Sequence, residues 1–361
     1  MTDLHTLYTT NGATLAQDGI PLHFGDIKAE YHAALNDALL LDRSHEGRIE
    51  ITGRDRFEIL NRISTNNILN IPQGEARPTL LINANGRILE RLIAFNWKDE
   101  SLLILTGPGR GKLVFDYLSR QIFFNDQAQV RDLSAETYQF TLHGPKSSAV
   151  FADLLDTPLS QNPFQGEHIT VADKSVYTSL LKPFSEQHRL LICSREDAPI
   201  VWETLIQAGQ KHGLRSGGGL TYNTLRIRAG FPGIGRELST DYIPLEVGLW
   251  DEVSFNKGCY TGQEIIARME SRERIAKTIV HLTLDRAVNA PIELFSEGKK
   301  AGTLTSSVTT PDGEHLGIGI LKTGVVQTGH TLTVGEETNA QATIGNLIGT
   351  QPAWILEHVK G

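Results

Sequence analysis

The residue types that favour chemistry lie in the octet KGCYTGQE, at residues 257–264. Thr261 followed three residues later by Glu264 is a capping-box pattern, which predicts a helix that continues through residues 265–267. Cys259 would then lie two residues before the N-cap, near the positive end of the helix dipole and close to Lys257. Both influences favour a thiolate, which suits a nucleophile, a redox-responsive thiol or a soft-metal ligand. A free cysteine is also commonly a small buried hydrophobe, and the residues alone leave both interpretations open.

The second cysteine has a simpler interpretation. Cys193 ends the apolar run of residues 190–192, which predicts a position in the core. It lies far from Cys259 in the chain, and neither cysteine belongs to a CxxC pattern or has an HxxxH partner. The sequence therefore predicts no metal site.

The octet belongs to a longer segment of unusual texture, Tyr222 to Arg272. Its many glycines predict irregular backbone, yet aromatic and aliphatic residues are interleaved with them, which argues against a disordered linker. We therefore predict an ordered functional loop that leads into a helix.

Two similar halves precede this loop. The alternating run at residues 48–52, a break at Gly53 and a helix around Phe57 to Ile63 are followed by strand-like runs and a helix at 112–123. The same order starts again with a strand at 138–143 and a break at Gly144, about 90 residues later. We predict two related ferredoxin-like α+β lobes at residues 46–135 and 136–272, the second carrying the octet. A helix over Asp26 to Leu40 is expected in an N-terminal segment, residues 1–45, that packs on the lobes.

The chain changes character after residue 272. Short β-rich runs separated by Gly, Pro and Asp replace helical periodicity, which is typical of a small all-β barrel. The fold class is therefore α+β with a C-terminal β-barrel domain at residues 273–361.

Composition restricts the function classes. Of 361 residues 40% are hydrophobic and 21% are charged, as in a globular protein, and the net charge is −8. This balance disfavours a general nucleic-acid binder, although a local basic patch leaves a tRNA partner open. Two cysteines exclude a disulfide framework, and neither a signal peptide nor a membrane span is evident. We expect a cytoplasmic protein with no membrane partner.

The octet, preceded by IPLEVGL and LRIRAG, resembles the signature of the YgfZ-like folate-binding proteins. These belong to the superfamily of the glycine-cleavage T-protein, an aminomethyltransferase. The resemblance extends from about Ser44 (SHEGRIEITG) through the hairpin at Asn85-Gly86-Arg87 to the C-terminal β region. It implies three domains in a ring, with tetrahydrofolate bound at the centre.

Two residues separate the branches of this superfamily. T-proteins carry an Asp-Asp pair after the hairpin, one member of which serves the folate nitrogen. Here the matching pair is Glu90 and Arg91, so that one carboxylate is longer and the other is replaced by a cation. This departure counts against aminomethyl transfer. The alternative interpretation is a solvated pair on a strand face.

A folate needs carboxylate partners for its pterin, apolar walls and cations for its glutamate tail. Glu246 is a candidate pterin partner or a structural acid, and Tyr242 and Trp250 are candidate walls or core residues. Arg226 and Arg236 are candidate partners of the tail. With Glu90 these complete the predicted cofactor-binding set, beside Cys259 and Lys257 as the predicted catalytic pair.

The first functional hypothesis is a tetrahydrofolate-binding protein that supports assembly or repair of iron–sulfur enzymes, with those enzymes or their assembly proteins as partners. The alternative is a folate-dependent aminomethyltransferase or another one-carbon transferase.

Overall fold

The computed structural model describes residues 3–184, 186–336 and 339–359. Its contacts divide the chain into two compact units. Unit 1 comprises Met1–Ile59, Ile68–Arg77 and Leu92–Leu225, and unit 2 comprises Leu60–Asn67, Pro78–Arg91 and Arg226–Gly361. The ring arrangement and the domain boundaries predicted at residues 45, 135 and 272 stay predictions.

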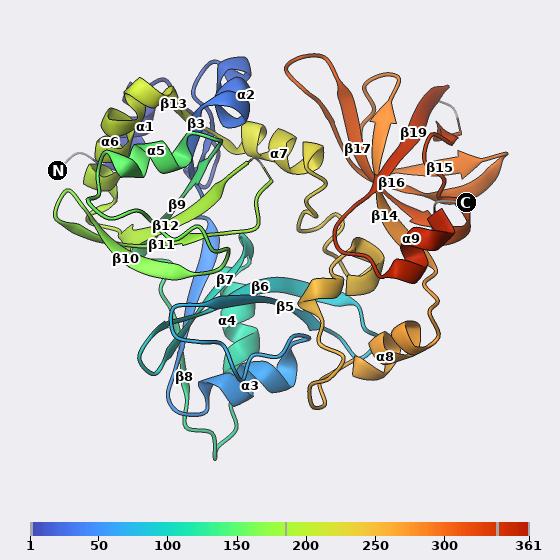
Figure 1. The fold of residues 1–361 in the computed structure, drawn as a ribbon, viewed down its shortest axis with the longest axis horizontal. Helices are drawn as coiled ribbons and strands as arrows, with labels where there is room; N and C mark the ends of the chain where they lie inside the picture. Colours follow the sequence, from blue (N-terminus) through green and yellow to red (C-terminus); the bar gives the residue numbers. More distant parts are fainter. Residues whose placement is uncertain (1–2, 185, 337–338, 360–361) are drawn as a thin grey trace. The chain divides into compact units, whose positions relative to one another are not determined.

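The first predicted lobe is confirmed as an α+β element order (Figure 1). It runs β4 (Glu46–Thr52), α3 (Arg56–Ile63), β5 (Ala76–Ile82), β6 (Ile88–Lys98), β7 (Ser101–Pro108), α4 (Gly111–Arg120) and β8 (Gln129–Asp132). The strand order in the sheet is β5-β6-β7-β4-β8. This is the ferredoxin-like arrangement with β5 added at one edge.

The second lobe repeats that plan. It runs β9 (Thr137–His143), α5 (Ser147–Ala152), β10 (Gly166–Val171), β11 (Lys174–Leu180), β12 (His188–Ser194), α6 (Ala198–Gly209) and β13 (Leu214–Gly217), with η1 (Gln210–His212) between the last two. Its strand order is β10-β11-β12-β9-β3-β13, which reproduces the first sheet except for the insertion of β3 (Ala38–Asp42).

Two glycines at matching positions explain why both lobes turn in the same way. Gly53 follows β4 and Gly144 follows β9, with φ of 98° and 99°. A Cβ atom at these positions would lie 2.3 Å from the Gln127 carbonyl oxygen or 2.6 Å from that of Asp37. Only glycine combines this backbone conformation with so close an approach. The duplication inferred from these two residues is therefore supported in detail.

The N-terminal segment corrects one prediction. The helix expected over residues 26–40 is α2 (Ile27–Asn36), which ends before a strand rather than at Leu40. The strand β3 is buried at every residue, pairing with β9 antiparallel and with β13 parallel. Leu39 and Leu40 therefore pair with residues of β9 and β13, and this long-range pairing overrides their helical spacing. The remaining elements here are α1 (Leu4–Thr10), β1 (Thr14–Leu15) and β2 (Pro21–His23).

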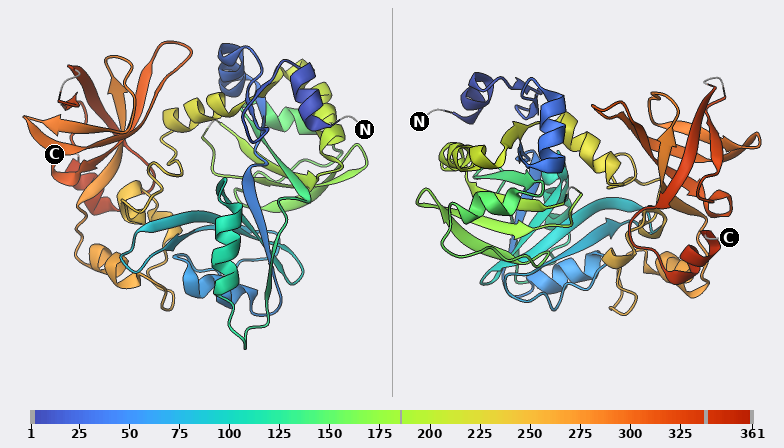
Figure 2. Two further views of the ribbon diagram at one scale, coloured as in Figure 1. Left: turned by 180° about the vertical axis from the view of Figure 1, so that it is seen from behind. Right: turned by 45° about the horizontal axis from the view of Figure 1, so that its top comes forward.

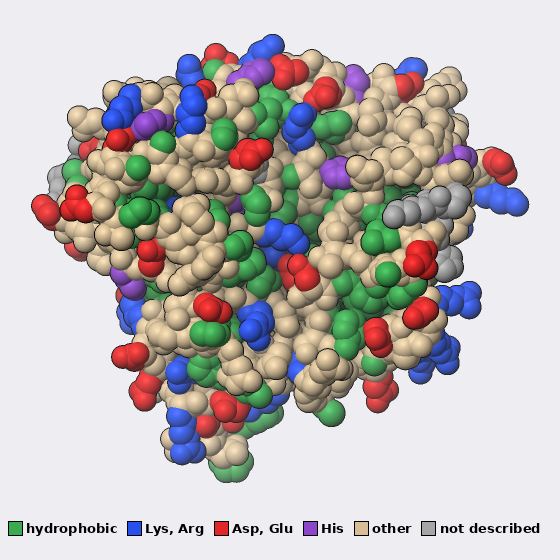
Figure 3. Space-filling view, in the orientation of Figure 1, with side chains coloured by type: hydrophobic (Ala, Val, Ile, Leu, Met, Phe, Trp, Pro, Cys, Tyr) green, Lys and Arg blue, Asp and Glu red, His purple; other side chains and the backbone are tan. Residues whose placement is uncertain are grey.

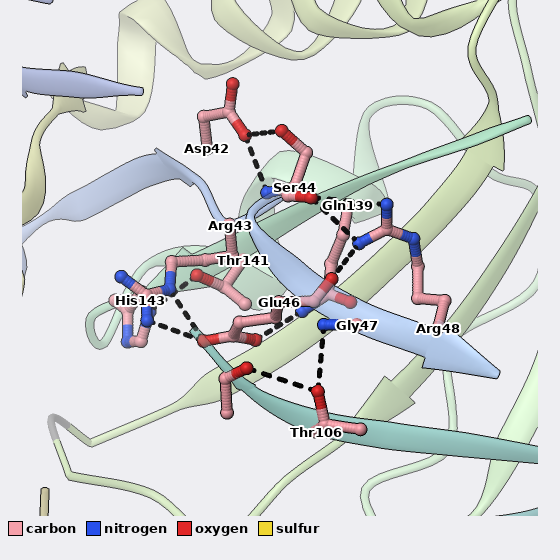
Figure 4. Close-up of polar contacts among 11 residues, drawn as sticks. Asp42, Arg43, Ser44, Glu46, Gly47, Arg48, Thr106, Gln139, Thr141 and His143 are labelled. Carbon is pink, nitrogen blue, oxygen red and sulfur yellow. Dashed lines mark hydrogen bonds and ion pairs between the residues drawn. The ribbon is translucent and has the colours of Figure 1, made fainter. Parts of the chain in front are cut away.

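Arg48 ties the first strand of one lobe to the start of the other within unit 1. Its side chain is fully buried and donates to the main-chain carbonyls of Ser44 and Glu46 (Figure 4). It also donates to the carbonyls of Ser134 and Thr137. Burial lowers the pKa of Arg48 to about 10. Main-chain oxygens here satisfy a buried cation, a structural role rather than a catalytic one.

The two sheets share an apolar core in unit 1. Phe95 and Trp97 of β6 meet the Tyr177 ring of β11 edge to face, at centroid distances of 5.7 and 5.6 Å. Cys193 lies in a second core between the β9–β12 sheet and helices α5 and α6, as its apolar run predicted. Burial raises the pKa of the Cys193 thiol to about 12, so that the thiol stays protonated.

The C-terminal region is a closed barrel, as predicted, visible from two further directions in Figure 2. Its strand order is β14-β17-β16-β15-β18-β19. The strands are β14 (Lys277–Leu284), β15 (Ile292–Ser296), β16 (Lys299–Thr309), β17 (His315–Lys322), β18 (Thr331–Val334) and β19 (Ala340–Leu347), with η4 (Thr323–Val325) after β17 and α9 (Ala353–Val359) at the end.

The remaining elements belong to the glycine-rich segment. They are α7 (Gly219–Arg228), η2 (Pro244–Val247), η3 (Trp250–Glu252) and α8 (Gln263–Ser271). Among the described residues, no helix combines the length and apolar character that crossing a membrane requires. On the face drawn in Figure 3, basic side chains are interspersed with acidic ones, as on an ordinary solvated surface.

Candidate functional site

The glycine-rich segment is ordered by an apolar cluster within unit 2. Leu245 and Val247 of η2 are fully buried, and they belong to one cluster with residues of β5, β6, α8 and the barrel. The prediction of an ordered loop is therefore confirmed. The short 3-10 turns place charged side chains at defined points on this apolar base.

Glu90 and Arg91 occupy successive positions on β6, so their side chains point to opposite faces of the strand. Glu90 is 1% exposed. The Arg91 guanidinium binds the Glu252 carboxylate bidentately, with Nε–Oε2 and Nη2–Oε1 distances of 2.7 Å, and lies 5.3 Å from the Phe231 ring centroid. The interpretation of a solvated pair is wrong, because Glu90 is buried and Arg91 is committed to a buried acid.

Glu246 is 5% exposed and its Oε2 accepts from the main-chain N–H of Ile243 at 3.2 Å. The same oxygen lies 3.4 Å from a guanidinium nitrogen of Arg87. Burial raises the pKa of Glu246, with the Ile243 bond acting in the opposite direction. The structural role foreseen for this acid is therefore present, and its role toward a pterin stays a prediction.

Within the part of the chain that the structure describes, Lys257 forms no ion pair with a carboxylate. Its ammonium group donates to the main-chain oxygens of Asn61, Ser64 and Asn66, at 2.5, 2.6 and 2.7 Å. Its nitrogen also lies 5.1 Å from the centroid of the Tyr260 ring. Burial lowers the pKa of Lys257 to about 8. The predicted influence of this cation on Cys259 stays a prediction.

The Cys259 side chain is exposed, which excludes the interpretation of this residue as a buried hydrophobe. The predicted capping box is wrong, because α8 begins at Gln263 and its N-cap is Gly262, with φ of 80° and no side-chain cap. A Cβ at Gly262 would lie 2.4 Å from the carbonyl oxygen of Asn83 in the hairpin. The N-cap therefore lies one residue later than predicted, at a glycine that packs against the hairpin.

The predicted cations of the tail are engaged within unit 2. Arg226 donates to the Phe231 oxygen and the Ser306 hydroxyl, and it lies 3.6 Å from the carboxylate of Glu237. Arg236 is exposed and donates to the Ala290 oxygen at 3.3 Å. A role of either arginine toward a glutamate tail stays a prediction.

The two predicted aromatic walls belong to the apolar cluster of unit 2. Tyr242 is 7% exposed and Trp250 is 8% exposed, and the Trp250 indole donates to the Leu245 oxygen at 3.1 Å. Their contacts fit the core interpretation, and any contact of these rings with a pterin stays a prediction.

Two buried acids of unit 2 were not identified from the sequence. Glu252 pairs with Arg91, and Glu237 is fully buried, accepting from the hydroxyls of Thr305 and Ser306. Their partners lie many residues away, so no local spacing marks them. The single available signal was a Glu within an apolar, glycine-rich segment. Unit 2 thus gathers buried carboxylates, three arginines that lie beside them, and an exposed thiol, a set suited to proton transfer at a polar ligand.

Comparison with known proteins gives consistent results. The model of the GCVT N-terminal domain family matches residues 4–257. An Arabidopsis thaliana chloroplastic protein named "Putative transferase" is 31% identical over 91% of this chain and 76% of its own length. An aminomethyltransferase of Halalkalibacterium halodurans is 28% identical over 86% of each chain. The crystal structure of glycine cleavage system aminomethyltransferase T from Bartonella henselae matches with a TM-score of 0.83 at 21% identity, covering 98% of this chain and 97% of its own, and supports the fold.

Proposed function

Because the chain belongs to the family of the GCVT N-terminal domain, we propose that it is a tetrahydrofolate-dependent one-carbon transferase of the aminomethyltransferase type. The observation that carries this proposal is the match over residues 4–257, joined by relatives named as transferases over most of their length. The proposal reverses the order of the two hypotheses drawn from the sequence.

The buried carboxylate of Glu90 supports this chemistry. In the family one acid of the pair serves a folate nitrogen, and we propose that Glu90, which is buried on β6, takes that role here. Bound tetrahydrofolate would supply two nitrogens that each form a bond to the one-carbon unit, while that carbon's bonds to the amino nitrogen and to the carrier sulfur break. The two N–H protons would leave with the ammonia and with the carrier thiol. A carboxylate close to one of these nitrogens would take its proton and pass it to a leaving group.

The change at Arg91 limits the reaction to one acid. Since Arg91 neutralises Glu252, the second carboxylate of the family's pair is replaced here by an internal ion pair. We infer that Glu90 alone handles the proton. The pair also holds η3 beside β6. A shift of β6 would change the position of Glu90, and the reaction rate depends on that position.

Calorimetric titration with tetrahydrofolate tests the ligand. We expect saturable binding at one site per chain, and weaker binding by Glu246→Gln. Glu293→Gln, at an exposed position of barrel strand β15, is the matched control and should bind as the wild type does. A protein that folds but shows no heat of binding would sink the proposal.

A second candidate function has its own support. The exposed thiol of Cys259 and the complete octet favour the YgfZ-like role in assembly or repair of iron–sulfur enzymes. We propose complementation as the test: a deletion strain carrying Cys259→Ala should lack activity of its iron–sulfur enzymes, whereas Cys193→Ala should restore it. Full rescue by Cys259→Ala would remove this candidate.

A further inference from the structure

We infer that Lys257 is a positioning residue, whose ammonium group fixes segment 251–259, and with it Glu252 and Cys259, on segment 61–66. Both segments belong to unit 2. The inference depends on the proposed function only for its consequence in catalysis.

The ammonium group fills a site made of main-chain oxygens. Asn61 lies in the last turn of α3, where carbonyls lack helical partners, and Ser64 and Asn66 follow directly. All three oxygens lie within 2.5–2.7 Å of the Lys257 nitrogen. An ammonium group has three donors, so these contacts use its whole capacity. A cation at the end of a helix is also favoured by the helix dipole.

The same turn binds the start of the positioned segment. The Thr65 hydroxyl donates to the Glu252 carbonyl at 2.8 Å, and the Ser254 N–H donates to the Thr65 carbonyl at 3.0 Å. The Asn66 amide donates to the Pro78 oxygen at 2.8 Å, which attaches the turn to β5. Segment 251–259 is therefore held at both ends by one short turn, and Lys257 makes the second attachment.

This attachment reaches the chemistry through two neighbours. Glu252, five residues before Lys257, carries the carboxylate that binds Arg91, next to Glu90 on β6. Cys259, two residues after Lys257, is exposed and precedes α8. The residues between them have no helix or strand, so these contacts, together with the packing of Val253 and Phe255 on the apolar cluster of unit 2, hold their conformation.

Hydrogen exchange without ligand tests the inference directly. Lys257→Met should speed the exchange of amides in residues 251–262 about tenfold, because the charge-assisted bonds of the ammonium group are lost. Amides of the barrel strand at residues 299–309 should keep their rates, which separates a local release from global destabilisation. Lys322→Met is the matched control, since Lys322 is an exposed lysine that donates to a single carbonyl, that of Lys300, at 2.7 Å.

Ammonium chloride adds a specific readout. In Lys257→Ala the three oxygens lose their donor, and free ammonium ions should slow the exchange of residues 251–262 again, whereas sodium chloride at equal ionic strength should not. Where Lys257→Met fails to fold, Lys257→Arg tests the inference instead. A planar guanidinium cannot replace a single nitrogen that donates to three surrounding oxygens. That variant should exchange faster than the wild type in residues 251–262.

Several results would overturn the inference. These are unchanged exchange in Lys257→Met, equal acceleration in residues 299–309, absence of ammonium rescue, or wild-type exchange in Lys257→Arg. If tetrahydrofolate-dependent transfer is established, an unchanged transfer rate in Lys257→Met would also contradict the inference that Lys257 is a positioning residue. The exchange measurements need no folate, so they judge the inference even where the proposed function fails.

Discussion

The Arg91 guanidinium and the Glu252 carboxylate form a bidentate ion pair, in which Glu252 keeps 2% and Arg91 12% of its side-chain exposure. The two residues are 161 positions apart in the chain. Within unit 2 the pair links the start of β6 to the turn η3, which precedes the octet. The pair commits Arg91 to a buried contact within unit 2.

Breaking this pair should reveal its energetic role. Arg91→Met leaves the Glu252 carboxylate buried without its cation, so the free energy of unfolding should fall by about 3 kcal/mol in urea titrations. The double variant Arg91→Met/Glu252→Gln should recover more than half of that loss. For comparison, Glu136→Gln removes an exposed pair with Arg131 and should cost less than about 1 kcal/mol. Strictly additive losses in the double variant would mean that the two side chains are not coupled.

Glu90 should matter for transfer more than for stability. Glu90→Gln keeps the shape but removes the carboxylate, so kcat should fall at least about 100-fold if this acid moves the proton. Glu90→Asp, which restores the shorter side chain of the family's pair, should retain activity. The rates are measured as ammonia release, with Glu293→Gln as the control. A Glu90→Gln rate within a factor of about two of the wild type would assign the proton to another group.

The glycine before α8 offers a steric test of the octet. In Gly262→Ala, a Cβ would meet the Asn83 carbonyl at 2.4 Å in addition to the strain of a φ of 80°. We expect a loss of about 3 kcal/mol in the free energy of unfolding, the sum of left-handed strain and overpacking. Gly298→Ala is the matched control, because Gly298 has a φ of 74° with nothing within 4 Å of its Cβ. Equal losses in the two variants would show that the contact with the hairpin is unimportant.

Two buried histidines predict a loss of stability in acid. Burial, and then the charge of Arg43, lowers the pKa of His45 to about 3, and burial with the neighbouring His188 lowers the pKa of His143 well below its ordinary value. Both pKa values are lower in the folded than in the unfolded chain. Their contribution is therefore fully present above pH of about 6.5 and is lost as the pH falls below that value.

The expected slope is about 1.4 kcal/mol per pH unit for each histidine, between pH of about 6 and 5. Urea titrations at several pH values measure it, and His143→Phe should reduce the slope. His143 lies in a stack with His188, at a ring distance of 4.5 Å, so an aromatic replacement preserves the packing. A free energy of unfolding that is flat over this range would contradict the neutral state of both rings.

Sequence patterns predicted the repeated elements because their signals are local. The breaks at Gly53 and Gly144 and the short apolar runs of the barrel are consequences of backbone conformation and burial within a few residues. The strand β3 was missed for the opposite reason. Leu39 has helical spacing from Leu35, and only pairing with the distant strands β9 and β13 turns residues 38–42 into a strand.

The candidate site was predictable in position but not in its contacts. The octet directed attention to Lys257 and Cys259, and the exposure of the thiol agrees with a functional role. The partners of Lys257 are three backbone oxygens, and backbone oxygens carry no residue signature. The partner of Arg91 could not be inferred either, because a salt bridge across the fold leaves no spacing in the chain.

The most direct test of the proposed function is a single assay of the purified protein with tetrahydrofolate and an aminomethylated carrier protein. We predict ammonia release that requires both tetrahydrofolate and the wild-type chain and that is lost in Glu90→Gln. Ammonia release at the same rate without tetrahydrofolate, or none from a protein that binds tetrahydrofolate, would contradict the assignment as a one-carbon transferase.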